Sequence, residues 1–332
     1  MSTPPALAGQ GPFFDDLAIG QEFTSAPAIT LTSGLAAAHQ AITGNRLPLM
    51  LDHELCRQVT GGGPIAPPSL VWDVAIGQST VVTQNVRANL FYRGLAFRRA
   101  PLIGDTLATV TQVVALRQNA ERKGRAATGL AALRIITTDQ EERPVLDFWR
   151  CAMLPLRDQS AITGHADDLS DVGREAPLAS YEALVSGWRL DHFPAAGPRP
   201  ADLHAGQSFD VAGGDVVSSA PELARLTANI AAVHHDKCAG GGERLVYGGH
   251  AIGLALSQAA RALPSMVTVS GWHGCDHLAP VREGDTLRST IMVEQVDYLP
   301  DGGGLVHLRS LVRADAPEAR DVLDWRYVAI LA

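Results

Sequence analysis

The stretch Ala279-Pro-Val-Arg-Glu-Gly-Asp-Thr-Leu287 decides the fold, because it repeats an earlier one, Ala100-Pro-Leu-Ile-Gly-Asp-Thr-Leu107, with one insertion. A Gly-Asp-Thr turn before a strand is common enough to recur by chance. Here, however, two further pairs of segments flank this pair in the same order and at similar spacing. They are Leu17–Phe23 with Leu203–Phe209, and Val145–Arg150 with Val322–Arg326 after one deletion. The chain is therefore predicted to contain two copies of one unit.

The sequence pattern of each copy predicts the same order of elements. A helical stretch and a Gly-rich loop come first, and a long apolar helix and several strands follow. The long helices are expected at about 69–82 and 250–263. They have so few polar positions that their surroundings must enclose them. The later segments are rich in β-branched residues and partly alternate, as strands do. One helix wrapped by an antiparallel sheet is the hot-dog arrangement, so the predicted fold class is α+β, a double hot-dog.

The repeat also predicts the domain boundaries. An N-terminal hot-dog is expected at 1–156, a linker at 157–200 and a C-terminal hot-dog at 201–332. The linker is rich in Asp, Ala, Gly and Pro, and one helix could form within it at 175–187. Each copy is long enough to bury a core of its own.

Composition argues against several function classes. The 332 residues carry a formal net charge of −8, which disfavours nucleic acid or an anionic membrane as a partner. There is no uninterrupted apolar run of about 18 residues, and the N-terminus lacks a basic region followed by an apolar one, so a cytoplasmic protein is expected. The 4 cysteines are scattered without Cys-x-x-Cys spacing. They indicate reduced thiols, so no zinc site or disulfide framework is expected.

The two copies differ where chemistry could occur. The informative segments of copy two are Asn229 to Asp236, Arg244-Leu-Val-Tyr-Gly-Gly-His250 and His277-Leu-Ala-Pro280. Copy one keeps Asn45, but it has Met50 at the position of His234 and Pro68 at the position matched to Gly249. Methionine cannot take a proton from water, and proline has no N–H to donate. Copy one is therefore predicted to be a scaffold that shapes the pocket.

These segments resemble the MaoC-like, R-specific enoyl-CoA hydratase family, and within it the mesaconyl-CoA hydratase (β-methylmalyl-CoA dehydratase) subgroup. The subgroup pattern of Asn-x4-His, Arg-Leu-x-Tyr-Gly-Gly-His and His-x-Ala-Pro is present in copy two. The resemblance covers nearly the whole chain. It implies a hydro-lyase acting on the C2=C3 bond of a short branched or carboxylated enoyl-CoA, with no metal or redox cofactor. The implied partner is the acyl-CoA thioester, and a homodimer is also expected.

Hydration of such a thioester needs a base for water, an acid for the α-carbon and donors for the enolate oxygen. Imidazole titrates near neutral pH, so His234 is the candidate base. The backbone N–H of Gly249, at the start of the buried helix, is the candidate donor. Most members of the family have Asp where this chain has Asn229, which can orient water but cannot transfer a proton. Either His234 makes both transfers through one water, or His235 or Asp236 supplies the second group.

Further residues are candidates for holding the substrate. Arg244 is the candidate for a carboxylate on the acyl group, with a position on the loop surface as the alternative. Arg98 and Arg99 are candidates for the CoA phosphates, with a solvated strand face as the alternative. For His250 and His277 a structural hydrogen bond is the alternative to substrate contact. The other substrate-binding candidates are Asp236, Tyr247 and Gly248.

Two other functions compete with the hydratase. Hot-dog thioesterases hydrolyse CoA esters, so the fold alone does not decide. A thioesterase needs a carboxylate on or beside the buried helix, and 250–263 contains none. A non-catalytic acyl-CoA-binding protein would be compatible with Asn229, but it would not explain why the copies differ at His234 and Gly249. The sequence therefore favours a hydratase.

Overall fold

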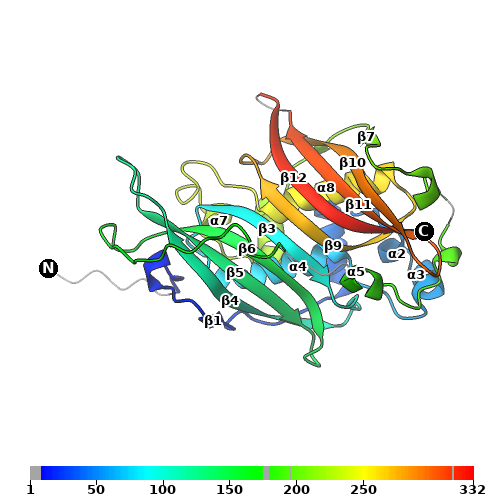
Figure 1. Ribbon diagram of the computed structural model, residues 1–332, viewed down its shortest axis with the longest axis horizontal. Coiled ribbons are helices and arrows are strands. Elements are labelled where there is room, and N and C mark those ends of the chain that lie inside the picture. The colour runs from blue at the N-terminus through cyan, green and yellow to red at the C-terminus, as the bar shows by residue number, and fades with distance from the viewer. Residues whose placement is uncertain (1–8, 175–178, 195, 316–317) are drawn as a thin grey trace.

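The two halves of the chain lie side by side and share one sheet (Figure 1). The computed structural model describes residues 9–174, 179–194, 196–315 and 318–332. Strands β3 (Ala88–Phe97) and β9 (Met266–His277) pair antiparallel and join the two halves. The sheet runs β1-β4-β5-β6-β3-β9-β12-β11-β10-β7, with β2 paired to β4 and β8 paired to β10. This arrangement confirms the predicted α+β class.

In the first half, short helices precede one buried helix and four long strands. The early elements are η1 (Phe14–Asp16), β1 (Glu22–Phe23), β2 (Ile29–Thr30), α1 (Ser33–Thr43), α2 (Pro48–Leu51) and α3 (His53–Thr60). They lead to α4 (Pro68–Gln78), η2 (Ser79–Val81), β3, β4 (Thr106–Gln118), β5 (Thr128–Thr138) and β6 (Pro144–Pro155). The side chain of Thr32 caps α1 and that of Asp52 caps α3. Gly44 and Gly61 end these helices in the left-handed conformation that glycine tolerates.

The second half repeats this order. Its early elements are β7 (Ser208–Asp210), β8 (Asp215–Val216), α6 (Ala220–Leu226) and α7 (Ala232–His235). The buried helix α8 (Gly248–Ala262), β9, β10 (Thr286–Tyr298), β11 (Gly304–Ala314) and β12 (Arg320–Leu331) follow. The connecting segment holds α5 (Ala179–Ala183), η3 (Leu190–His192) and η4 (Pro200–Asp202). Residues 175–178 of the helix expected at 175–187 lie outside the described residues.

Each half of the sheet packs around its long helix. Helix α4 contacts β4 and β5, and α8 contacts β10, β11 and β12. Every residue of α4 is buried, as are all residues of α8 from Gly249 to Ala260. Trp72 of α4 meets Trp272 of β9 and Trp325 of β12, with ring centroids 4.8 and 6.1 Å apart. The predicted double hot-dog is confirmed, with an interior continuous across the join.

Matching contacts correct one detail of the repeat. Gln78 on α4 and Gln258 on α8 each donate to a carbonyl of the neighbouring sheet, both at 2.9 Å. Pro68 and Gly248 each lie ten residues before these glutamines, and each is the first residue of its helix. Pro68 is therefore the counterpart of Gly248, and the predicted match to Gly249 is wrong by one residue.

The last strands of the two halves match without the predicted deletion. Asp147 on β6 and Asp324 on β12 each accept two hydrogen bonds from an arginine of the neighbouring strand. Arg150 and Tyr327 each lie three residues after these aspartates. Arg150 is therefore the counterpart of Tyr327 and not of Arg326. Both of these side chains are buried, whereas Arg326 is exposed. The first half therefore has a buried arginine where the second has a tyrosine.

Segments of the second half also pack on the end of the first half's helix. The Ala232 N–H donates to the Gln84 carbonyl and the Ile230 N–H to Thr80 Oγ1, both at 2.9 Å. Gly77 permits this contact, because a Cβ on it would lie 1.8 Å from the Thr227 carbonyl oxygen. Both halves consequently form the walls of the space beside α7.

Candidate active site

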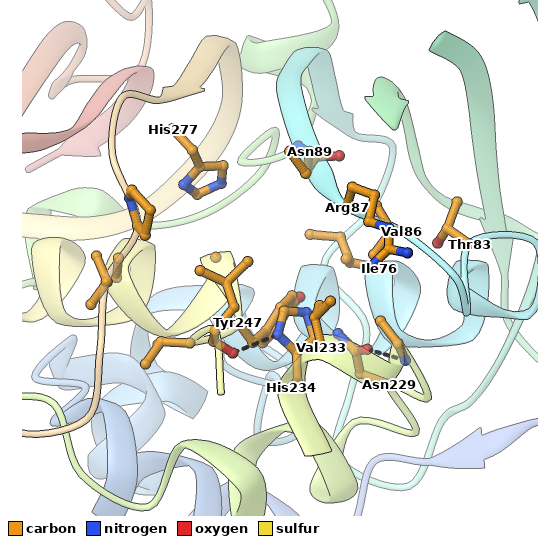
Figure 2. A pocket seen from close by; sticks show the side chains of 18 of the residues that line it. Ile76, Thr83, Val86, Arg87, Asn89, Asn229, Val233, His234, Tyr247 and His277 are labelled. Atoms are coloured by element: carbon orange, nitrogen blue, oxygen red, sulfur yellow. Dashed lines mark hydrogen bonds between the residues drawn. The ribbon is translucent and has the colours of Figure 1, made fainter. Parts of the chain in front are cut away.

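A cavity of about 310 Å³ lies between the two halves. In Figure 2, His234, Asn229 and Tyr247 face Arg87, Asn89 and Thr83 across it, with His277 at one end. Most other lining side chains are aliphatic. A small, largely apolar space with a few polar groups suits a short acyl chain. The polar lining also includes Thr80, Tyr92, Arg150 and Gly248.

His234, the third residue of α7, is held as a neutral base. Its Nδ1 lies 2.8 Å from the Leu245 carbonyl oxygen. A carbonyl can only accept, so Nδ1 carries the hydrogen and Nε2 is left as an acceptor. Burial lowers the pKa of His234 to about 4, with the Leu245 hydrogen bond acting in the opposite direction. The imidazole is therefore unprotonated at neutral pH.

Asn229 is 2% exposed, and one atom of its side-chain amide is already hydrogen-bonded. The Ala231 N–H donates to it at 3.0 Å, so the facing atom is the oxygen. Asn45 makes the same bond with Leu47 at 3.2 Å, which confirms that the two asparagines are equivalent. The remaining Asn229 group is the NH₂, which can donate a hydrogen bond into the cavity but cannot take a proton.

Helix α8 begins at Gly248, so the prediction that Gly249 opens it is wrong. Gly248 lines the cavity, and a Cβ on it would lie 2.5 Å from the His277 ring. Gly249 lies one step inside the helix, where a Cβ would lie 2.0 Å from Asp73 Oδ1. The first-turn N–H groups of α8 and the positive end of its dipole favour negative charge at this point. The equivalent Pro68 lacks an N–H.

The first half holds Tyr247 in place. The Tyr247 hydroxyl donates to Asp73 Oδ1 at 3.1 Å, and Asp73 Oδ2 lies 2.9 Å from His39 Nε2. Asp73 and His39 are both fully buried. The Tyr247 ring packs edge-on against His234, with centroids 5.7 Å apart. Sequence analysis did not single out Asp73 or His39, because only the packing of α1 and α4 brings them to Tyr247.

Three predicted residues near His234 are not among those that line the cavity. His235 Nε2 lies 2.6 Å from the Asn229 carbonyl oxygen. Asp236 is exposed and accepts from the Cys238 N–H at 2.8 Å. His250 is fully buried within α8. The geometry therefore gives no support to His235 or Asp236 as the second proton-transfer group.

The predicted arginines also lie outside the lining. Arg98 and Arg99 follow the far end of β3, roughly 36–40 Å along the chain from Arg87 at about 3.3 Å per extended residue. Arg98 pairs with Asp147, and Arg99 pairs with Asp105 and Asp139 beside the Gly-Asp-Thr turn. The carbonyl of Arg244 accepts from Arg282 at 3.0 Å. A different arginine, Arg150, lies in the cavity wall.

Known proteins resemble the chain over nearly its whole length, although no family model matches it. A conserved hypothetical protein from Mycobacterium tuberculosis, described as having a double hot-dog fold, is 52% identical, with 98% of this chain and 100% of that chain covered and a TM-score of 0.91. β-Methylmalyl-CoA dehydratase from Chloroflexus aurantiacus is 28% identical over 94% of this chain and 91% of its own. Mesaconyl-CoA hydratase from Cereibacter sphaeroides is 27% identical over 90% and 88%. The chain is thus similar over nearly its whole length to a hydratase and a dehydratase of CoA thioesters, and it shares the double hot-dog fold.

His277 is the second imidazole that lines the cavity. Its Nε2 is buried and has no hydrogen-bond partner among the described residues. Burial lowers the pKa of His277 to about 4, and the nearby His234 adds to this effect. His277 is therefore a neutral ring at the cavity wall, with its Nε2 packed close to Gly248. Among the described residues nothing supports a structural hydrogen bond for this nitrogen, and substrate contact by His277 stays a prediction.

Arg150 was not predicted as a site residue, although the sequence contained a signal for it. It lies on β6 and is 3% exposed. Along this strand Leu146 and Phe148 are buried, and the alternation of strand side chains places Arg150 on the same interior face. An arginine at an interior position of a strand is unusual enough to indicate a function.

Two other features are absent from the part of the chain that the structure describes. There, no group of three or more His, Cys, Asp or Glu side chains is arranged to hold a metal ion. The helices of the same residues include none with the length and apolarity to cross a membrane.

Proposed function

We propose that the chain is a hydro-lyase that adds water to, or removes it from, the C2=C3 bond of a short carboxylated enoyl-CoA. One observation carries this proposal: His234 donates through Nδ1 to Leu245 and so keeps an acceptor nitrogen on the ring that lines the cavity, beside the start of α8. The relatives named above as a hydratase and a dehydratase support the same reaction class. CoA enters as part of the substrate, and no further cofactor is required.

In the proposed reaction, the thioester carbonyl and C3 of the acyl group meet different groups of the site. The thioester carbonyl lies at the first turn of α8, where backbone N–H groups stabilise the enolate oxygen by roughly 3 kcal/mol. His234 Nε2 takes a proton from water as the water oxygen bonds to C3. The His234 imidazolium formed in this step then gives its proton to C2, which completes the addition of water and regenerates the neutral imidazole. Asn229 donates its amide hydrogen to orient the water. The reverse steps remove water.

The substrate class rests on the relatives and on the cavity. Mesaconyl-CoA and β-methylmalyl-CoA, the compounds in the relatives' names, each carry a free carboxylate beyond C3. The cavity is small and contains the buried cation of Arg150. A short acyl group with a terminal anion therefore matches both its size and its charge.

A thioesterase is the second candidate, because Asp73 places a carboxylate beside the buried helix after all. A Cβ on Gly249 would lie 2.0 Å from Asp73 Oδ1, so the two are in contact. Asp73, however, is fully buried behind Tyr247 and does not line the cavity. Its two oxygens accept from Tyr247 and face His39, so it is not available to activate water.

The test is an assay of the purified protein with mesaconyl-CoA and crotonyl-CoA, in which loss of the enone absorbance is followed. We expect hydration by the wild type and a fall in turnover of about 10²–10⁴-fold in His234→Ala. Release of free thiol, followed in the same reactions, identifies a thioesterase. A wild type that releases thiol, or that binds esters without changing them, would refute the hydro-lyase.

A further inference from the structure

Arg150 is held rigidly in the wall of the cavity. Its Nη2 donates to Thr83 Oγ1 at 2.7 Å and to the Ser79 carbonyl at 3.1 Å. Ser79 is the C-cap of α4, so this carbonyl belongs to the negative end of the helix dipole. The Tyr92 hydroxyl is a further hydrogen-bond partner of the guanidinium, while Nε is buried without a partner among the described residues. Arginine has five donors in a fixed fork, so donors remain unused.

The charge of Arg150 has no anion beside it. Among the described residues, no carboxylate lies within ion-pair distance of this side chain, although the other buried acids of the sheet pair with arginines. Burial raises the pKa of the neighbouring Tyr92 and Tyr247 phenols, so these groups stay neutral. Arginine itself does not lose its proton in proteins. A buried cation without a counter-charge is costly, and truncating its partner in known ion pairs destabilises proteins strongly.

We propose that Arg150 binds the free carboxylate of the acyl group and so determines the preference for carboxylated thioesters. This inference rests on the function proposed above and adds the residue that selects its substrate. The unused guanidinium donors can meet a carboxylate in two-pronged fashion. Bound carboxylate supplies the missing negative charge inside the cavity. The acyl terminus then lies toward β6 and the end of α4, with C3 left beside His234.

Two other arginines are weaker candidates for this role. Arg87 lines the cavity, but its side chain is exposed, so water already solvates its charge. It suits the CoA moiety near the surface. Arg244, the residue expected from the sequence, does not line the cavity. Among the arginines that the structure describes, Arg150 alone combines burial, unused donors and a place in the cavity wall.

The experiment separates binding from catalysis by using saturated thioesters that cannot be hydrated. Succinyl-CoA carries a terminal carboxylate, and butyryl-CoA is its uncharged counterpart. Affinities for both are measured by calorimetry in the wild type, Arg150→Met, Arg150→Lys and Arg244→Met. Arg326→Met is the matched control, because Arg326 lies on the equivalent strand β12, is 49% exposed and pairs with Glu294 outside the cavity.

We expect the wild type and Arg326→Met to prefer succinyl-CoA. Arg150→Met should lose roughly 10²-fold in succinyl-CoA affinity and change little toward butyryl-CoA, as for removal of one partner of a buried charge pair. Arg150→Lys should recover part of the preference, since it keeps the charge without the fork. Equal weakening toward both thioesters would overturn the proposal, as would loss of the preference in Arg244→Met instead.

Two further results keep the test decisive. Without ligand, Arg150→Met should melt at or above the wild-type temperature, because it removes an unbalanced buried charge. A purely structural role predicts a lower melting temperature and an unchanged preference. If Arg150→Met does not fold, a wild type with no preference for succinyl-CoA overturns the proposal by itself. Failure of the hydro-lyase appears differently: mesaconyl-CoA stays unhydrated while the Arg150-dependent binding preference persists.

Discussion

The Nδ1 atom of His234 lies 2.8 Å from the carbonyl oxygen of Leu245, and this contact determines which nitrogen of the ring can act as a base. In a His234→Asn variant, the side-chain amide can still donate to Leu245 but offers no imidazole. We expect a stably folded protein whose kcat for hydration falls by about 10²–10⁴-fold. Circular dichroism and melting temperature check the fold. Hydration above a tenth of the wild-type rate would show that another group activates water.

The pH dependence of hydration should reflect the burial of His234. The base must be unprotonated, and burial lowers its pKa from the ordinary value of 6.5 to about 4. We therefore expect kcat/KM, which reports on the free enzyme, to stay level as pH falls through 6.5 and to decline only toward pH 4. Initial rates at subsaturating substrate measure this. An acidic limb near 6.5 would mean that the active base is a solvated imidazole.

Protein stability should depend on pH in the same range. Burial lowers the pKa of His234, His250 and His277 to about 4, so the unfolded state binds more protons between that value and 6.5. The three histidines then make their full contribution to the free energy of unfolding above pH 6.5, and this contribution declines as pH falls toward 4. Urea denaturation across this range tests the slope. His250→Leu should flatten it, because His250 is fully buried outside the cavity; an unchanged slope would contradict this assignment.

Asn229 should contribute much less than His234. Its oxygen is held by the Ala231 N–H, so only its amide hydrogens can reach water or substrate. A neutral hydrogen bond is worth roughly 0.5–1.5 kcal/mol, and Asn229→Ala should therefore lower kcat by about tenfold. Steady-state kinetics on mesaconyl-CoA provide the measurement. A variant as inactive as His234→Asn would instead show that Asn229 holds an obligatory proton-relay water.

The first half should stay inactive even with a restored histidine. Met50 is the third residue of α2, as His234 is of α7. Pro68, the counterpart of Gly248, has no N–H to donate at the start of α4. The cavity beside His234 contains Arg150 from the opposite half, whereas a cavity beside Met50 would have Tyr327 at the matching position. Met50→His should consequently leave the turnover per chain unchanged and the progress curves single-phased. A doubled turnover, or a second kinetic phase, would show that the first half retains a working site.

Much of the candidate site was predictable because its signals lie close together in sequence. Asn229 and His234 are five residues apart, and the Tyr247 to His250 segment follows a glycine-rich loop. The resemblance to the family rests on these local runs, and the lining of the cavity contains Asn229, His234, Tyr247, Gly248 and His277. Arg244 was a weaker prediction, because position along the chain does not reveal which way a loop side chain points.

The sequence by itself determined the duplication, the double hot-dog and the difference between a histidine-bearing half and a half without one. Repeats, apolar helices and missing functional groups can all be read along one chain. Only the tertiary structure decided that β3 pairs with β9, that Asp73 and His39 hold Tyr247, and that Arg150 enters the cavity of the other half. Tyr247 and Asp73 are 174 residues apart, yet they share a hydrogen bond. Packing of two copies against each other creates such contacts, and no local pattern encodes them.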